Sequence, residues 1–115
     1  VRLSRGLGDV YKRQDLKRFV ELTSTNPAKM YGMYPQKGVI KVGSDADLTF
    51  WDPNLKKKIS QNDLNHGSDY TPYEGLEITG WPVQTWLRGN KIFDNGEFTT
   101  VNNLGKYMSR DFSSF

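Results

Sequence analysis

The chain has 115 residues, the size of one ordinary domain, and leaves no room for two. It has no cysteine and one histidine, so disulfides, cysteine-based metal sites and sites that need two imidazoles are excluded. No apolar run approaches the roughly 20 residues of a membrane-spanning helix, and the N-terminus lacks the apolar stretch of a secretory signal. These properties predict a soluble, cytoplasmic protein that does not bind membranes.

The opening stretch, residues 1–14, carries the whole net charge of the chain. It has four basic side chains against Asp9 alone, whereas the other 101 residues have twelve basic and twelve acidic side chains. The segment GDVYKRQ is open to three interpretations: a basic arm that binds nucleic acid, a glycine-turn phosphate loop, or a peptide foreign to the protein. Because the rest of the chain is neutral, we expect no nucleic-acid binding from it.

Two short helices are expected within residues 15–36. After Asp15, four side chains recur at the spacing of one helical face: Leu16, Phe19, Val20 and Thr23. Asn26 is predicted to cap a second helix that begins at Pro27, where a missing N–H costs nothing. Gly32 is predicted to end it.

The next segments predict short strands. Residues 37–42 and the alternating residues 46–51 flank a turn at Gly43-Ser44. Asp52-Pro53 is expected to end the second of these strands, because proline has no N–H for a ladder. A third strand is predicted at residues 55–60.

The second half of the chain predicts a surface loop followed by a meander. Residues 60–75 are rich in turn formers, and residues 76–98 return to a period of two. Gly89-Asn90 and Asn95-Gly96 are two-residue hairpin signals. About six strands after two helices predict a β-rich α+β fold. In the polar tail, residues 99–115, Tyr107-Met108 is a candidate docking segment.

Asp45 and Asp47 are the first candidate site. Two residues apart on a strand, they share a face and could act as an acid–base pair or hold a cation. The alternative is a structural role, with Asp45 in the Gly43-Ser44 turn and Asp47 at an exposed edge. We favour the structural role, because nothing nearby in the sequence supplies further ligands.

The other candidates are also weak. His66, Ser68 and Asp69 could form a nucleophilic triad, but sequence neighbours rarely converge, and a polar loop histidine is favoured. Lys56–Lys58 beside Phe50 and Trp51 could bind nucleic acid, but alternation sends Lys57 to the opposite face, which favours a solvated strand. Four aromatics could line a pocket but are more typical of sheet core or interface: Tyr70, Tyr73, Trp81 and Trp86. Tyr73-Glu74-Gly75 has no evident catalytic partner.

Longer motifs carry a more specific signal. TSTNPAKMYGMYPQKGVIKVGSDADLTFWDP resembles the C-terminal part of the cyclic amidohydrolases, and YTPYEGLEITGWPVQTWLRGNKIFDNGEF is most similar to the dihydropyrimidinase and hydantoinase group. The resemblance covers residues 15–115. It implies terminal helices of a metal-dependent (β/α)8 barrel at residues 15–36, C-terminal strands of a small β-sandwich at residues 37–98, and a C-terminal tail.

The resemblance also implies a chemistry. Such enzymes open dihydropyrimidine or hydantoin rings with a hydroxide activated by two divalent metal ions, usually zinc, and the complete protein would be a homo-oligomer, expected to be a tetramer. All of the implied ligands lie upstream, so no catalytic, cofactor-binding or metal-binding residue is assigned here, His66 included, and the chain alone is expected to be inactive and metal-free. The alternatives are a non-catalytic dihydropyrimidinase-related scaffold, an allantoinase or dihydroorotase, and a free-standing β-rich binding module.

Two further expectations concern the ends and faces of the chain. RGLGDVYKRQ departs from the family pattern and resembles the translation of a transposon end used in sequencing-library preparation, so residues 1–14 are interpreted as an artefactual or disordered peptide. With an upstream barrel and strands missing, apolar side chains of the sheet should be partly uncovered: Leu48, Phe50, Val83 and Leu87. We therefore expect the isolated chain to be marginally stable or prone to aggregation.

Overall fold

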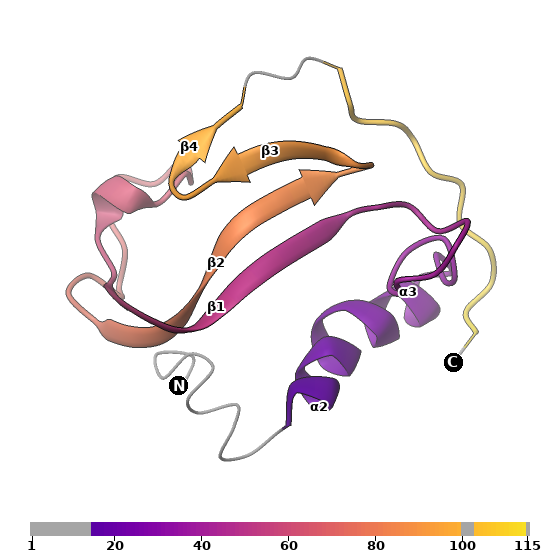
Figure 1. The fold of residues 1–115 in the computed structure, drawn as a ribbon, viewed down its shortest axis with the longest axis horizontal. Helices are drawn as coiled ribbons and strands as arrows, with labels where there is room; N and C mark the ends of the chain where they lie inside the picture. The colour runs from indigo at the N-terminus through magenta and orange to yellow at the C-terminus, as the bar shows by residue number, and fades with distance from the viewer. Residues whose placement is uncertain (1–14, 100–102, 115) are drawn as a thin grey trace.

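The computed structural model describes residues 15–99 and 103–114. A helical run is followed by one antiparallel sheet and an extended tail that returns to the end of the helical run (Figure 1). A β-rich α+β fold is thereby confirmed. The prediction for residues 1–14 lies outside the described residues.

The helical run, residues 16–30, is continuous, so the expectation of two separate helices is wrong. Helix α2 (Leu16–Val20) passes through a π-helical turn (Glu21–Thr25) into α3 (Asn26–Met30). Asn26 has helical dihedrals, φ −65° and ψ −44°, and its amide bonds to the carbonyl of Glu21, so it is not a cap. Pro27 has no N–H and its ring crowds the preceding turn, and the wider π turn makes room for it.

The predicted stop of the helical run at Gly32 is confirmed, and its start has a cap at Asp15 that was not predicted. The carboxylate of Asp15 caps the start by accepting from the amide of Arg18 at 2.7 Å. Gly32, at φ 72°, follows the last helical turn. The amides of Gly32 and Met33 bond to the carbonyls of Lys29 and Ala28, at 3.3 and 2.7 Å. This pair of bonds is a Schellman motif, which needs the left-handed conformation that glycine adopts easily.

Residues 37–42 do not form the predicted strand. The turn that follows does form, with the amide of Ser44 bonded to the carbonyl of Lys41 at 3.0 Å. No described strand pairs with residues 37–42, and Ile40 and Val42 are 88% and 100% exposed. A strand needs a neighbour to complete its hydrogen bonds, so residues that favour a strand do not suffice without a partner.

Strand β1 (Leu48–Lys58) replaces two predicted strands and continues through Pro53. It pairs with β2 (Glu77–Leu87), and the register shifts between Asp52, opposite Trp81, and Lys56, opposite Thr79. Pro53 lies in this bulge, where no ladder bond is required of it. The prediction that Asp52-Pro53 ends the strand is therefore wrong.

Two tight turns complete a meander with the order β1-β2-β3-β4, so the described part of the chain has four strands in place of about six. The turn between β2 and β3 (Asn90–Asp94) is Arg88-Gly89, with φ 46° and 80°, one residue before the predicted position. Asn95-Gly96, at φ 47° and 95°, connects β3 to β4 (Glu97–Phe98) as predicted. Residues 59–76 form the expected loop, with a short 3-10 helix at Gln61–Asp63.

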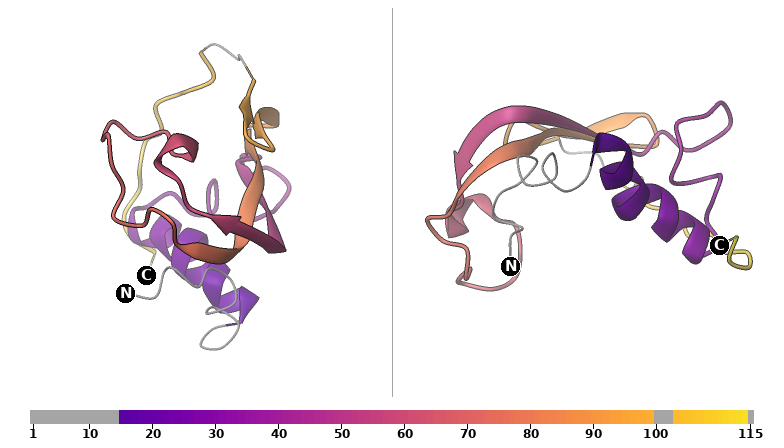
Figure 2. Two further views of the ribbon diagram at one scale, coloured as in Figure 1. Left: turned by 90° about the vertical axis from the view of Figure 1, so that its left-hand side faces the viewer. Right: turned by 90° about the horizontal axis from the view of Figure 1, so that it is seen from below.

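The sheet is a curved ribbon with the helical run beside β1 (Figure 2). Phe19 meets Trp51 edge to face at 5.6 Å between ring centroids. Among the described residues, the buried apolar side chains are Ala28 and Ile78, and Phe50 remains 48% exposed. The apolar faces of the sheet are therefore partly uncovered, as expected for four strands in a single layer.

Candidate functional site

Asp45 and Asp47 converge on one lysine, and we call Lys37, Asp45 and Asp47 the Lys37 cluster. The ammonium group of Lys37 lies 2.8 Å from Asp45 Oδ2 and also donates to Asp47 Oδ2. Gln36 Nε2 donates to Asp45 at 3.1 Å, and the amide of Asp45 bonds to the carbonyl of Gln36 at 2.9 Å. The cluster holds both sides of the Gly43-Ser44 turn together.

Asp47 also connects this loop to a turn of the sheet. Its Oδ1 accepts from the backbone amide of Arg88 at 2.9 Å, and the amide of Gly89 bonds to the carbonyl of Ala46 at 3.0 Å. Arg88 is a non-glycine residue at φ 46°, a conformation that costs free energy. Asp47 therefore stabilises the Arg88-Gly89 turn from 41 residues away.

The electrostatics of the Lys37 cluster argue against acid–base chemistry. The hydrogen bond from Lys37 holds the pKa of Asp45 below its ordinary value. Burial alone would lower the pKa of Lys37, but hydrogen bonds and charge from Asp45 and Asp47 outweigh it and raise that pKa. Lys37 and Asp45 are thus both charged at neutral pH, whereas a general base works best with a pKa near the working pH.

The cluster also offers no metal site. The ammonium of Lys37 lies between the two carboxylates, where a cation would have to bind. Within residues 15–99 and 103–114, no group of three or more His, Asp or Glu side chains lies close enough together to hold a metal ion. These contacts favour the structural role for Asp45 and Asp47.

His66, Ser68 and Asp69 lie on the exposed loop and do not form a triad. Ser68 donates its backbone amide, not its hydroxyl, to His66 Nδ1 at 3.2 Å. All three residues are exposed. The arrangement is a local loop contact and supports the interpretation of His66 as a polar loop histidine.

The lysine cluster is divided between the two sheet faces. Lys57 is half-buried, and its Nζ atom lies 4.7 Å from the ring centroid of Trp81 and 3.7 Å from Asp63 Oδ2. Lys56 and Lys58 are exposed. Because alternate lysines face opposite ways, they do not form one phosphate-binding row beside Phe50 and Trp51.

The four candidate aromatics do not gather in one pocket. Trp86 packs against Phe50 with ring centroids 6.3 Å apart, and Tyr70 and Tyr73 are 70% and 43% exposed on the loop. Glu74, beside Tyr73, accepts from the amide of Gln61 at 2.6 Å and so closes the loop. These residues are sheet and loop contacts.

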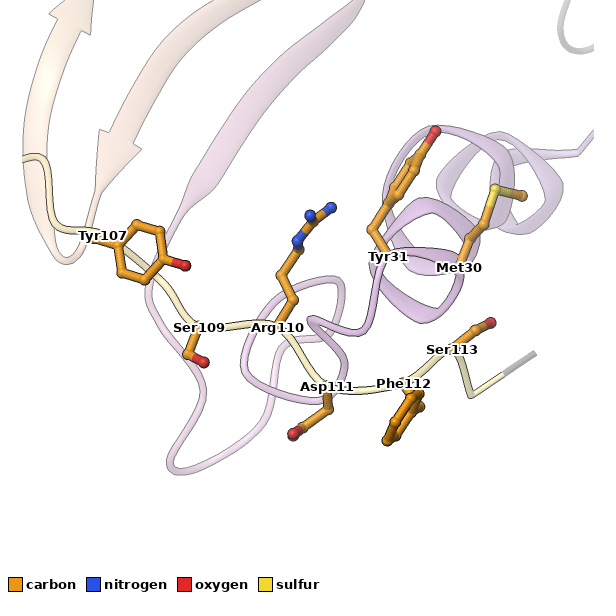
Figure 3. A pocket seen from close by; sticks show the side chains of 8 residues that line it. All are labelled: Met30, Tyr31, Tyr107, Ser109, Arg110, Asp111, Phe112 and Ser113. Carbon is orange, nitrogen blue, oxygen red and sulfur yellow. The ribbon is translucent and has the colours of Figure 1, made fainter.

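A shallow hollow of about 460 Å³ lies between the end of α3 and the tail, and sequence reasoning missed it (Figure 3). The hollow is lined by eight residues: Met30, Tyr31, Tyr107, Ser109, Arg110, Asp111, Phe112 and Ser113. Of the candidate docking segment, Tyr107 lines the hollow and is 96% exposed, whereas Met108 is half-buried. The sequence signal for this contact between the tail and the helix end is Gly32, which the sequence alone identifies only as a helix stop.

Comparison with known proteins shows the family to which this chain belongs. The family model described as Amidohydrolase family matches residues 2–92. The chain therefore belongs to the amidohydrolase family. The match includes most of the opening peptide, whose interpretation as an artefact stays a prediction.

Two curated relatives, both hydantoinases, are similar to most of this chain. The chain is 45% identical over 98 residues to a D-hydantoinase of Ralstonia pickettii, covering 85% of this chain and 21% of the relative. It is 38% identical to an L-hydantoinase of Paenarthrobacter aurescens, with the same coverage of both chains. The chain thus spans about a fifth of the length of the curated relatives it matches.

Solved structures agree with this grouping. A D-hydantoinase from a Bacillus species superposes with a TM-score of 0.88 and 34% identity, over 98% of this chain and 25% of that one. A dihydropyrimidinase from Brevibacillus agri superposes with a TM-score of 0.86 and 37% identity, over 94% of this chain and 24% of that one. No helix within the described ranges is long and apolar enough to cross a membrane.

Proposed function

We propose that this chain is the C-terminal part of a hydrolase that opens the ring of a cyclic amide, a dihydropyrimidine or a hydantoin. The observation that carries the proposal is the 45% identity to a D-hydantoinase over 85% of the chain. The superposition on a D-hydantoinase, with a TM-score of 0.88, supports it independently of any single motif. In this proposal, the complete enzyme is a cytoplasmic homo-oligomer, a tetramer.

Two divalent metal ions, zinc in our proposal, would supply the activated hydroxide that attacks the ring carbonyl. The described residues do not fit such a site: they contain no cluster of three potential ligands, and the whole sequence has one histidine. The ligands would therefore come from sequence outside this chain. We infer that the chain alone binds no metal and has no activity.

The division of the chain follows the same proposal. The helical run and the loop that follows, residues 15–36, would pack on a (β/α)8 barrel, and residues 37–98 would contribute strands to a small β-sandwich. The exposed Ile40 and Val42 support this division, because an apolar segment without a partner suits a sheet completed by other strands. The small number of buried apolar side chains within residues 15–99 and 103–114 supports the same division.

The test is to recover the coding sequence upstream of Asp15 and express the complete protein. We expect loss of ultraviolet absorbance when dihydrouracil or hydantoin is added, and loss of that activity after chelation. If an upstream barrel is present with its metal ligands replaced and no ring is opened, the protein is the non-catalytic scaffold. Turnover of allantoin or dihydroorotate alone would instead assign the protein to the related enzymes.

A further inference from the structure

We propose that residues 109–114 are a latch that docks through its backbone on the end of the helical run, and that Gly32 is its docking point. The amide of Asp111 donates to the carbonyl of Gly32 at 2.9 Å. The amide of Ser114 donates to the carbonyl of Lys29 at 3.0 Å. The latch thus gives a partner to the carbonyl of Gly32, which lies just past the helix end, and a second partner to the carbonyl of Lys29, which already accepts from the amide of Gly32.

The approach of the latch to Gly32 is too close for any side chain. A Cβ atom built on Gly32 would overlap the carbonyl oxygen of Asp111, and would lie 2.5 Å from its carbonyl carbon and 2.9 Å from its nitrogen. These are backbone atoms, which cannot swing aside as the end of a long side chain can. Gly32 is therefore needed twice, for its left-handed dihedrals and for the room it leaves for Asp111.

Side-chain burial contributes little to this docking. Phe112 is 98% exposed and Tyr107 is 96% exposed, although both line the hollow beside the latch. Figure 3 shows the tail passing the end of α3 as an extended segment. The contact should consequently tolerate truncation of Phe112 but not a side chain on Gly32.

A second anchor holds the other end of the tail. The guanidinium group of Arg88 donates to the carbonyl of Leu104. The tail therefore runs between a fixed point on the β2–β3 turn and a fixed point at the helix end (Figure 1). This arrangement places the latch opposite Gly32 and makes docking on the same chain the expected mode.

The test compares Gly32→Ala with Gly43→Ala in the 115-residue chain, by amide hydrogen exchange. Gly43 is the matched control, because it also has a positive φ, 92°, but nothing lies within 4 Å of a Cβ built on it. We expect G32A to speed exchange at the Asp111 and Ser114 amides by about tenfold or more, the effect of losing one or two hydrogen bonds. G43A and Phe112→Ala should leave both amides protected.

A second variant keeps the test decisive if G32A also loosens the helix end. Asp111→Pro removes the amide that donates to Gly32 while leaving the helix intact. Exchange at Ile78 in the sheet reports whether each variant is folded. In the D111P background, adding G32A should cost no more stability than adding G43A. If G32A lowers the stability equally with and without D111P, the proposal is overturned. It is also overturned if the protection of the Asp111 amide rises with protein concentration, because the tail would then dock on a second copy.

Discussion

Replacing Asp47 by alanine tests whether the Lys37 cluster stabilises the sheet. Asp47 accepts the amide of Arg88 and pairs with Lys37. A hydrogen bond to a charged group contributes about 1.5–3 kcal/mol, and a partly exposed ion pair adds at most about 1 kcal/mol. Because the Asp47 side chain keeps 31% of its surface exposed, we expect D47A to lower the free energy of unfolding by about 1–2 kcal/mol.

The assay is urea unfolding followed by the fluorescence of the three tryptophans, all of which lie in β1 or β2. Asp47→Asn is the first control, because its amide oxygen can still accept from Arg88. Asp45→Ala is the second, because the Asp45 side chain contacts Lys37 and Gln36 without reaching the sheet. The loss should be largest for D47A. An equal loss for D45A or D47N would refute the assignment of stability to the Arg88 amide bond.

Three further predictions follow from burial and charge. Because Lys37 lowers the folded-state pKa of Asp45, this ion pair stabilises the fold at pH values above the ordinary aspartate pKa. Its contribution should be lost as the pH falls through the lowered pKa. Urea unfolding repeated at pH values between about 5 and 2 measures this loss. Ile78→Ala should cost about 2 kcal/mol by the same urea assay, because Ile78 is the one buried apolar side chain of the described sheet. Replacing the exposed Ile40 and Val42 by threonine should leave the urea midpoint unchanged and reduce light scattering. A sharp melt of monomeric, unaltered chain would contradict the expected tendency to aggregate.

The helical region shows what a sequence pattern can and cannot specify. The stop at Gly32 was predicted because it depends on the residue itself, whereas the cap forms at Asp15 and not at Asn26, where it was predicted. Asn26-Pro27 fits a helix start and also fits a π turn within a longer helix. Which one forms depends on whether the preceding turn continues, and the run through Thr25 continues it.

The strands show the same limit more strongly. Residues 37–42 have the composition of a strand, but a strand also needs a partner, and the segment's own sequence does not show whether a partner is present. The bulge that accommodates Pro53 depends on the register with β2, which the sequence of β1 does not reveal. The Asn95-Gly96 turn was predictable because both residues favour positive φ, whereas the Arg88-Gly89 turn requires an arginine to adopt it.

The candidate site could be predicted in part. The spacing of Asp45 and Asp47 placed them near one another, and a structural role was favoured from turn chemistry alone. Their shared partner Lys37 and the bond to Arg88 could not be foreseen, because they join positions 10 and 41 residues from Asp47. Contacts across such distances are set by the folding of the meander and not by local preference.

The contacts that join distant segments hold the described part of the chain together, although few of its apolar side chains are buried. The carboxylate of Asp47 accepts from the amide of Arg88, and the guanidinium group of Arg88 donates to the carbonyl of Leu104. The carbonyl of Gly32 accepts from the amide of Asp111. Each of these contacts is polar and uses the backbone of at least one partner, so it fixes positions without burying apolar surface. Hydrophobic burial is the main favourable term in folding. We therefore infer that the contacts determine the arrangement of the segments, that the chain alone is marginally stable, and that the rest of the proposed hydrolase would add stability by covering the sheet.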